Sequence, residues 1–441
     1  MPKVRLIAMG LVFLVSGGCG MFLSRMPQEI PTYVNHSAEG LFLAGAAKVE
    51  ITPTESVWMG GYGILRGSQG VHDPLYARAL VLERGNLRFA LVSVDLVGIQ
   101  RQDLLKFLET LDFPPGQIVV CSTHNHSGPD TIGFWGLPPV YSGQDSEYMQ
   151  IVFCGIRKAL KQAQENLRPA EIAATAVTVD PAGIMKNIRR PGVVDRELIA
   201  VHLREQVSKE TIATLVELGC HSEVVGRTNQ LISADFPGWT VARLEAEMGG
   251  VGVYVVGAVG GLVSPDNPDD PERSDDDWPE AEKLGLRVAD LVIGGLKKSL
   301  LYNPAPNITV WHAPTYLHVE NLLYKVARFV GLFDRDIYRG NYVLTEVNVW
   351  EIGGLRIATV PGEITPDLGL RIKKALSGDV SMLIGLANDE LGYFLPEADY
   401  DLRIYSYERT LCPGRKAGDA ILRRIEDLML MHEQFRRIPS K

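Results

Sequence analysis

The chain has 441 residues, of which 46% are hydrophobic and 22% are charged, so it is long enough and apolar enough to bury a large core. The formal net charge is -9 at pH 7 and no lysine- and arginine-rich run is present, which argues against nucleic acid as a partner. Its 5 cysteines are widely spaced and form no CxxC pair, so the sequence indicates neither a disulfide framework nor a thiolate metal site.

The first residues have the layout of an export signal. Lys3 and Arg5 precede the apolar run 6–15, which is too short to span a bilayer. The small residues before Cys19 are similar to a bacterial lipoprotein processing site, and lipidation of that cysteine would hold the protein at a membrane surface. Ser16 departs from the aliphatic residue usual at its position, so ordinary secretion and an uncleaved anchor stay open as alternatives.

We therefore expect a signal peptide at residues 1–19 and a polar, irregular tether at residues 20–40. The mature protein is expected to be exported, either as a cell-envelope lipoprotein or as a secreted or periplasmic protein. The sequence does not indicate an oligomeric state.

From residue 41 onward, strand-like and helical patterns alternate without a break. Apolar residues recur every three or four positions in 148–167, 279–300 and 417–435, which predicts helices there, and Asp235 opens a further helix. Strands are expected at 42–51, 76–82, 89–97, 118–121, 172–179, 198–203, 212–218, 251–259, 343–352, 357–360 and 381–386. The sequence predicts one large α/β domain over residues 41–441, with a mixed β-sheet core flanked by helices.

Two histidines separated by one residue follow the strand expected at 118–121. His124 and His126 precede a Gly-Pro turn, and alternate residues of an extended segment point the same way, so both imidazoles can face one cleft. This pair suits a hydrolytic metal centre, in which one ring binds zinc and the other transfers a proton. The alternative is a polar loop in which the two rings only form hydrogen bonds.

Four other strand-like runs also end in loops that begin with reactive side chains. In α/β proteins the carboxyl ends of parallel strands border the functional crevice. We therefore expect the five loops to meet. The four further loops begin at Cys220-His221-Ser222-Glu223, at Gly260 to Pro265, at Pro361-Gly362-Glu363 and at Asn388 to Tyr393.

The order of these motifs resembles the catalytic domain of the neutral (non-lysosomal) ceramidases, zinc amidohydrolases that cleave the N-acyl bond of ceramide. Residues 123–129 match the family's T-H-x-H-S-G-P motif at every specified position, and residues 361–363 match its P-G-E. The runs 44–53, 59–62 and 70–80 are also similar. The resemblance covers roughly residues 42–412 and is typical of a short form without the family's C-terminal immunoglobulin-like domain.

The resemblance implies zinc bound by two imidazoles, a carboxylate and a phenolate oxygen, a donor set that suits this metal. These ligands are His124, His221, Glu363 and Tyr393. It also implies four catalytic residues, Ser264, His126, Arg189 and Tyr405. Arg190 is a close rival of Arg189, and Tyr407 is a rival of Tyr405.

Around Ser264 the sequence departs from the family motif G-D-V-S-P-N. It reads Gly-Leu-Val-Ser-Pro-Asp, with Leu262 in place of the aspartate and Asp266 in place of the asparagine. Hydrogen bonding around the serine must therefore differ. This departure leaves the preference for ceramide open.

The main hypothesis is a zinc-dependent amidohydrolase that releases a fatty acid and sphingosine from ceramide or a related N-acyl lipid. A second is a zinc amidase or esterase acting on another envelope or saccharide-linked acyl substrate, and a third is a surface lipoprotein that binds an envelope ligand without chemistry. The apolar segment 321–333 is either a lipid-contacting amphipathic lid or part of the core. The acidic segment 266–277 is either a solvated insertion or a second cation site.

Overall fold

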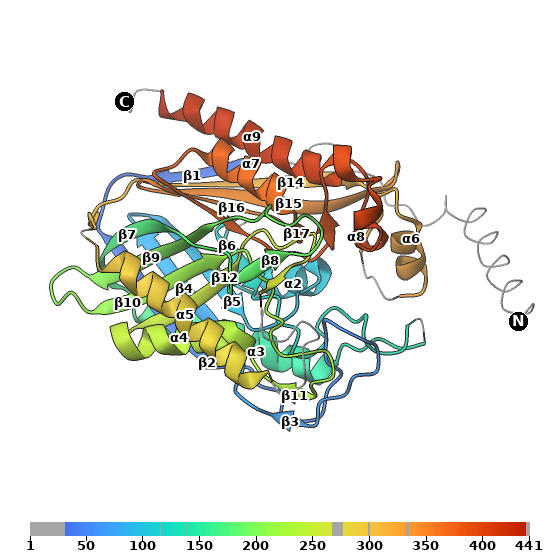
Figure 1. Cartoon of the computed structure of the whole chain (residues 1–441). Coiled ribbons are helices and arrows are strands. Elements are labelled where there is room, and N and C mark those ends of the chain that lie inside the picture. Colours follow the sequence, from blue (N-terminus) through green and yellow to red (C-terminus); the bar gives the residue numbers. More distant parts are fainter. Residues whose placement is uncertain are drawn as a thin grey trace, which may run out of the picture.

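A computed structural model describes residues 31–437 except 115, 139, 267–276, 299 and 332–334. Two β-sheets lie face to face, and helices cover the outer side of each sheet (Figure 1). The expected signal peptide with Cys19 and most of the acidic segment 266–277 lie outside the described residues. Within the described part of the chain, no helix combines the length and the hydrophobicity needed to cross a membrane.

The larger sheet has eight strands in the order β12-β10-β9-β7-β2-β4-β5-β6. Its β10/β12 and β5/β6 pairs are parallel and the other pairs are antiparallel. Only two residue pairs, Leu43 with Pro169 and Ala44 with Arg168, join β2 to β7. The strands are β2 (Phe42–Glu50), β4 (Tyr76–Arg84), β5 (Leu87–Val94), β6 (Ile118–Ser122), β7 (Arg168–Thr178), β9 (Glu197–Glu205), β10 (Thr211–Leu218) and β12 (Val251–Val256).

The smaller sheet has five strands in the order β1-β14-β15-β16-β18. Its strands are β1 (Tyr33–Ser37), β14 (Ile308–His318), β15 (Tyr342–Ile352), β16 (Leu355–Thr359) and β18 (Val380–Ile384). Short strands elsewhere are β3 (Gly70–Val71), β8 (Met185–Asn187), β11 (Leu231–Ile232), β13 (Val263–Pro265), β17 (Glu363–Ile364) and β19 (Tyr393–Phe394).

The prediction of an irregular tether at residues 20–40 is wrong for Tyr33–Ser37, because these residues form strand β1. It pairs antiparallel with β14 along its whole length, and His36 Nδ1 lies 3.0 Å from Thr309 Oγ1. An edge strand of this kind is held mainly by backbone hydrogen bonds. Its largely exposed side chains therefore carry little of the alternating pattern that reveals a strand in sequence.

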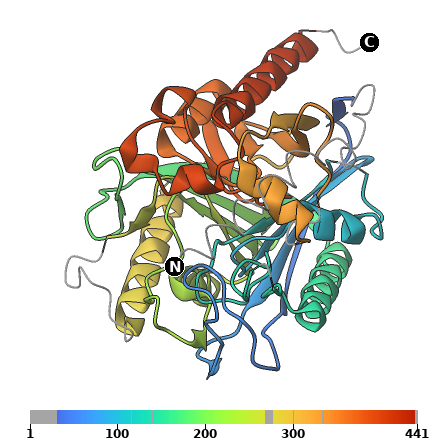
Figure 2. The same cartoon turned by 90° about the vertical axis from the view of Figure 1, so that its right-hand side faces the viewer.

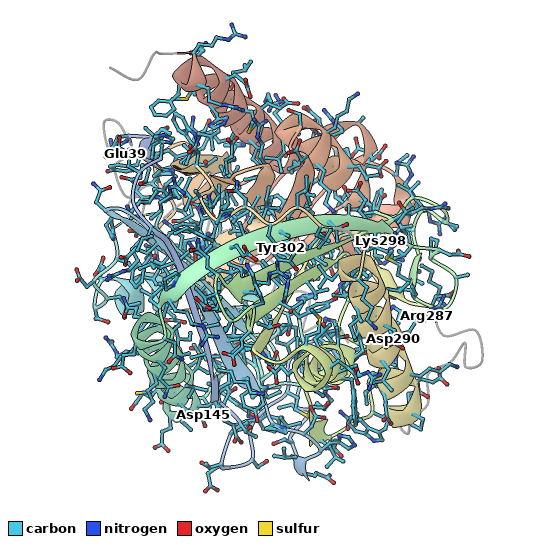
Figure 3. All side chains as sticks on the ribbon, turned by 90° about the vertical axis from the view of Figure 1, so that its left-hand side faces the viewer. Glu39, Asp145, Arg287, Asp290, Lys298 and Tyr302 are labelled. Atoms are coloured by element: carbon cyan, nitrogen blue, oxygen red, sulfur yellow. The ribbon has the colours of Figure 1, made fainter. Side chains whose placement is uncertain are left out.

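Helices bury an apolar stripe against the outer face of each sheet. On the larger sheet these are α2 (Arg101–Leu108), α3 (Ser146–Glu165), α4 (Asp235–Met248) and α5 (Trp278–Leu296); on the smaller sheet they are α7 (Pro366–Leu376) and α9 (Ala417–Arg436). Figure 3 shows Arg287 and Asp290 on the outward side of α5, where both are exposed. Two short helices, α6 (Leu322–Phe329) and α8 (Glu408–Leu411), and the 3-10 helices Glu397–Asp399 and Arg403–Tyr405 complete the fold.

The main core lies between the two sheets, where Phe89 of β5 meets Trp350 of β15 edge to face with ring centroids 5.0 Å apart. The predicted α/β class with a mixed β-sheet core flanked by helices is confirmed. The strands are divided between two sheets, which single-strand periodicity does not reveal.

Hydrogen bonds beyond the strand ends bring three loops together. After β18, the Asn388 side chain accepts a hydrogen bond from Val120 N of β6 at 2.7 Å, and the backbone N–H of Asn388 donates to Val120 O at 2.8 Å. After β6 and β10, Asn125 and Ser222 form a parallel bridge. These links place the histidine loops next to the segment that leads to Tyr393.

Candidate metal centre

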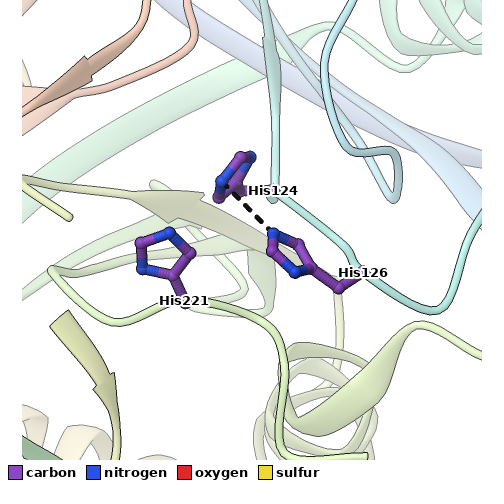
Figure 4. Close-up of side chains that lie close together, drawn as sticks. All are labelled: His124, His126 and His221. Atoms are coloured by element: carbon purple, nitrogen blue, oxygen red, sulfur yellow. Dashed lines mark hydrogen bonds between the residues drawn. The ribbon is translucent and has the colours of Figure 1, made fainter. Parts of the chain in front are cut away.

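Three buried imidazoles meet between the loops after β6 and β10. His124, His126 and His221 each offer one ring nitrogen, and these three atoms lie within 4.8 Å of one another (Figure 4). The Nε2 atoms of His124 and His126 are 3.4 Å apart. Both histidines of the H-x-H pair therefore face one cluster, as their spacing predicts, and His221 comes from a loop almost a hundred residues further along.

The outer nitrogens of two rings are held by backbone carbonyls. His124 Nδ1 lies 2.8 Å from Val97 O, and His221 Nδ1 lies 2.9 Å from Val263 O. A carbonyl oxygen only accepts, so each Nδ1 carries a proton. This arrangement, common for metal-binding histidines, leaves each Nε2 free to face the cluster.

A carboxylate completes the group. Glu363 Oε2 is 3.1 Å from His221 Nε2 and 3.4 Å from His124 Nε2. Burial alone would raise the pKa of Glu363, but the neighbouring His124 and His221 outweigh it and lower that pKa well below its usual value. Because each histidine already has a proton on Nδ1, a positive charge must lie between Nε2 and Oε2, either a further ring proton or a metal ion.

These donors fit a divalent transition metal. Imidazole nitrogens and a carboxylate oxygen converging in a buried space are the ligands that zinc prefers.

Tyr393 lies beside this cluster. Its strand β19 pairs in parallel with β17, in register with Glu363. Burial, and then the Glu363 charge, raise the pKa of the Tyr393 phenol well above its usual value. The structure therefore brings all four sequence-predicted ligands to one place, and it also places His126 within the imidazole cluster.

The backbone here is locally constrained. His124 adopts φ 59°, in the left-handed region that non-glycine residues rarely occupy. Gly61 has φ +94°, and a Cβ at this position would lie 2.5 Å from His126 Cγ. Only glycine fits beside that ring.

An apolar pocket of about 550 Å³ adjoins the cluster. Its polar lining includes His124, His126, Glu363 and Tyr393. The apolar part of its lining comprises Val97, Ile132, Phe134, Trp135, Leu262, Leu323, Ala327, Leu391 and Leu411. The volume and the few grouped polar side chains are typical of a small-molecule site.

Ser264 lies on β13 and is buried, with its Oγ donating a hydrogen bond to Glu223 Oε1 at 2.6 Å. The other oxygen of that carboxylate, Oε2, is 3.5 Å from His126 Nδ1. Glu223 also lines the pocket. The carboxylate of Glu223 thus joins two residues predicted to be catalytic.

The predicted arginine lies at the same pocket. Arg189 is among its lining residues, and its Nε donates to Glu408 Oε1 at 2.7 Å. The rival Arg190 instead pairs with Asp367 at 3.1 Å and Asp399 at 3.0 Å.

The two candidate tyrosines occupy different places. Tyr407 lines the pocket, and its ring centroid is 5.9 Å from that of Tyr393. Tyr405 is buried beneath Gly261 and is not among the described residues that line the pocket. Burial raises the pKa of Tyr405 to about 12.

Several pocket residues had no assigned role in the sequence analysis. Tyr62 packs edge to face on His126 with centroids 5.1 Å apart, and the aromatic pair Phe134 and Trp135 follows the histidine motif closely. Glu390 also lines the pocket, and its Oε2 is buried without a hydrogen-bond partner among the described residues. For Phe134 and Trp135, the available signal was their position close to the histidine motif in the sequence.

Together, the fold and the site define an α/β protein with a buried candidate metal centre beside an apolar pocket. The chain belongs to the neutral/alkaline non-lysosomal ceramidase family, because the model of that family's N-terminal region matches residues 42–264, about half of the chain.

Individual relatives agree with this assignment. The chain is similar to the neutral ceramidase of Pseudomonas aeruginosa, with 25% identity over 225 residues that cover 46% of this chain and 33% of the relative. It is also similar to the neutral ceramidase of Oryza sativa subsp. japonica, with 24% identity over 257 residues, 53% of this chain and 31% of the relative. The matched part therefore spans about a third of these relatives.

The fold is also that of a solved structure. The crystal structure of the Pseudomonas aeruginosa neutral ceramidase superposes with a TM-score of 0.72 at 18% identity, covering 91% of this chain and 76% of that chain. A second solved structure, a ceramidase complexed with C2, gives a TM-score of 0.73 at 17% identity, with the same coverage. At this identity the likeness shows a shared fold.

Proposed function

We propose that this protein is a zinc-dependent hydrolase that cleaves the N-acyl amide bond of ceramide or a related N-acyl lipid, releasing a fatty acid and an amine such as sphingosine. The observation that carries this proposal is the cluster of three imidazoles and a carboxylate lining a largely apolar pocket. Family membership supports the same reaction.

The proposed metal ligands are His124, His221, Glu363 and Tyr393. Zinc held there would polarise an amide carbonyl and lower the pKa of a bound water. The carbonyls of Val97 and Val263 keep His124 and His221 in the orientation that ligation requires.

The proposed proton carrier is His126. Burial, and then the nearby His124 and His221, lower the pKa of His126 well below its usual value, so its ring is neutral and can accept a proton before passing it to a leaving amine.

Arg189 and a tyrosine would stabilise the negative charge that develops on the carbonyl oxygen. Of the two tyrosines that the sequence allows, Tyr407 lines the pocket, which favours it over Tyr405. Ser264, held by Glu223, would either attack the carbonyl or orient it.

The apolar lining supports a lipid substrate. Ile132, Phe134 and Trp135 form part of the wall, and Leu323 and Ala327 of α6 form another part. An acyl chain placed here would remove apolar surface from water, which contributes about 25 cal/mol for each Å² buried.

Helix α6 supports contact with a lipid surface. None of its residues is buried, and Leu322, Leu323 and Phe329 are 49%, 55% and 61% exposed. Tyr324 anchors the helix by donating to Leu411 O at 3.0 Å. Figure 2 shows α6 in the foreground, on the side of the molecule that lies at the right in Figure 1. Tyr324 and Ala327 pack partly buried against the hydrophobic core, so the segment combines a core-facing side with an exposed apolar side.

We further propose that α6 touches a membrane from which substrate enters the pocket. Export and lipidation of Cys19 would keep the protein close to such a surface.

One assay tests the proposed reaction. The zinc-loaded chain is incubated with an N-acylsphingosine and, separately, with simple amides and esters, and the released fatty acid or acid product is measured. Preferential release from the N-acylsphingosine is expected, and H124A should abolish it. Turnover confined to other amides or esters would instead favour the alternative acyl substrate, which the replacement of the family aspartate by Leu262 already makes worth testing. No turnover with any compound would reject a hydrolase.

A further inference from the structure

Glu223 occupies a position that connects two predicted catalytic groups. It follows His221 by two residues, and its side chain is only 8% exposed. Its Oε1 accepts a hydrogen bond from Ser264 Oγ at 2.6 Å, while its Oε2 lies 3.5 Å from His126 Nδ1. One carboxylate thus faces both the serine and the proton-carrying histidine.

The contact with His126 decides the orientation of that ring. His126 Nε2 points into the cluster, 3.4 Å from His124 Nε2. Its Nδ1 is buried and has no hydrogen-bond partner within the usual limit among the described residues, so Glu223 Oε2 is the nearby acceptor. A carboxylate at this place favours the tautomer with a proton on Nδ1 and a lone pair on Nε2.

The contact with Ser264 decides the direction of its hydroxyl. A hydrogen bond of 2.6 Å from a hydroxyl to a carboxylate is in the range of short, charge-assisted bonds. The bond fixes the hydroxyl proton toward Glu223, so the oxygen lone pairs point elsewhere. Val263, which precedes the serine, also holds His221 through its carbonyl, so the serine, His221 and His126 share one rigid frame.

The carboxylate next to Ser264 belongs to Glu223 and does not come from the motif that contains the serine. Where the resembled motif has an aspartate two residues before the serine, this chain has Leu262, whose side chain contributes to the apolar lining. Leu262 also adopts φ 55°, a conformation that costs free energy for leucine. The charge next to Ser264 is instead supplied by Glu223, 41 residues earlier in the chain.

We infer that Glu223 is a positioning residue of the reaction, which orients Ser264 and fixes the tautomer of His126. The expected effect of Glu223 on kcat rests on the proposed function. Its expected effect on the tautomer of His126 rests on geometry alone. Glutamine at this position has one acceptor oxygen and one donor group, so it cannot turn an acceptor oxygen toward each of the two neighbours as the carboxylate does.

The kinetic test compares E223Q, E223D and a matched control. E223Q should lower kcat about 10- to 100-fold, as replacement of residues that orient ligands does, while KM and zinc content stay within about twofold. E223D, which keeps the charge, should retain more activity than E223Q. The control is E171Q, since Glu171 is similarly buried but pairs with Lys209 at 2.9 Å on the larger sheet. E171Q should leave kcat unchanged.

A double-mutant cycle separates positioning from a general structural effect. If Glu223 acts through Ser264, E223Q should reduce kcat less than about threefold in an S264A background. Equal losses in both backgrounds, or a kcat of E223Q within twofold of the wild type, would overturn the inference.

A measurement independent of turnover follows the histidine itself. Selective 15N labelling of the 9 histidines, with H126A to assign the signal, reports which ring nitrogen of His126 carries the proton. We expect Nδ1–H in the wild type and a changed tautomer in E223Q, with no change in E171Q. The same tautomer in wild type and E223Q would contradict the inference. If the wild type hydrolyses no substrate, the proposed function fails, yet this measurement still decides the role of Glu223.

Discussion

A buried network of charged side chains around Glu346 should make the unfolding free energy depend on pH by an amount that can be worked out from the structure. Glu346 of β15 forms an ion pair with Arg101, accepts a hydrogen bond from Asn388 Nδ2 at 2.7 Å, and lies 3.8 Å from His312. Asn388 also holds Val120 of β6. The network therefore connects the smaller sheet to the strand that leads to His124.

The magnitude follows from the pKa of this carboxyl. Burial alone would raise the pKa of Glu346, but Arg101, His312 and Asn388 outweigh it and lower the pKa from 4.5 to about 2. At about 1.4 kcal/mol for each pKa unit, the ionised form stabilises the folded state by about 3 kcal/mol at neutral pH. A lowered folded-state pKa means that this contribution is complete above pH 4.5 and is lost as the pH falls through about 2. Near pH 3, about 1.4 kcal/mol should be left.

Urea unfolding of wild type and E346Q across pH 3 to 7 tests this reasoning. Glutamine cannot ionise, so E346Q should be about 3 kcal/mol less stable at pH 7, and the difference should shrink to less than half at pH 3. The control is E165Q, because Glu165 is exposed and its ion pair with Lys161 is long, at 3.8 Å. The unfolding free energy of E165Q should match that of the wild type at every pH. A wild-type advantage that is the same at pH 3 and pH 7 would refute the assignment of this energy to Glu346.

Three further predictions concern the site. H221A should no longer bind stoichiometric zinc. It should also lose the stabilisation that zinc gives, which is about 2.7 kcal/mol of unfolding free energy at a zinc concentration of 100 times the Kd. H432A, which removes an equally buried histidine of α9, should keep both properties, as metal analysis and urea unfolding can measure. Y407F should lower kcat 10-fold or more and Y405F should not, and the reverse order in steady-state kinetics would assign the role to Tyr405. F329E in α6 should reduce hydrolysis of a vesicle-borne N-acyl lipid at least fivefold but leave a short-chain soluble analogue unaffected, because Phe329 is 61% exposed and is not among the described residues that line the pocket. Equal loss on both substrates would place the effect within the pocket.

Much of the site could be predicted because its residues follow strands. His124, His221 and Glu363 come a few residues after the ends of β6, β10 and β16, and strand ends that carry reactive side chains are visible in a single sequence. The structure brings these three side chains together. Their chemical roles were inferred from the resemblance and stay predictions.

Other features could not be predicted because they depend on tertiary contacts. Strand β14 has no strong alternating pattern, since both of its faces are largely buried, one against the core between the two sheets and the other beneath α9. The choice between Tyr405 and Tyr407 depends on the 3-10 turn at Arg403–Tyr405, which turns one ring inward and leaves the other at the pocket. The link from Glu223 to Ser264 joins residues 41 positions apart, and no local pattern encodes it.

The left-handed backbone conformation of His124 affects any attempt to select variants of this protein for higher thermal stability. An asparagine or glycine would relax that conformation, which costs a bulkier residue about 1 to 3 kcal/mol, yet either would delete an imidazole from the cluster. Heat-based screening would therefore reward the loss of this side chain, and a library made to raise thermal tolerance should leave codon 124 untouched.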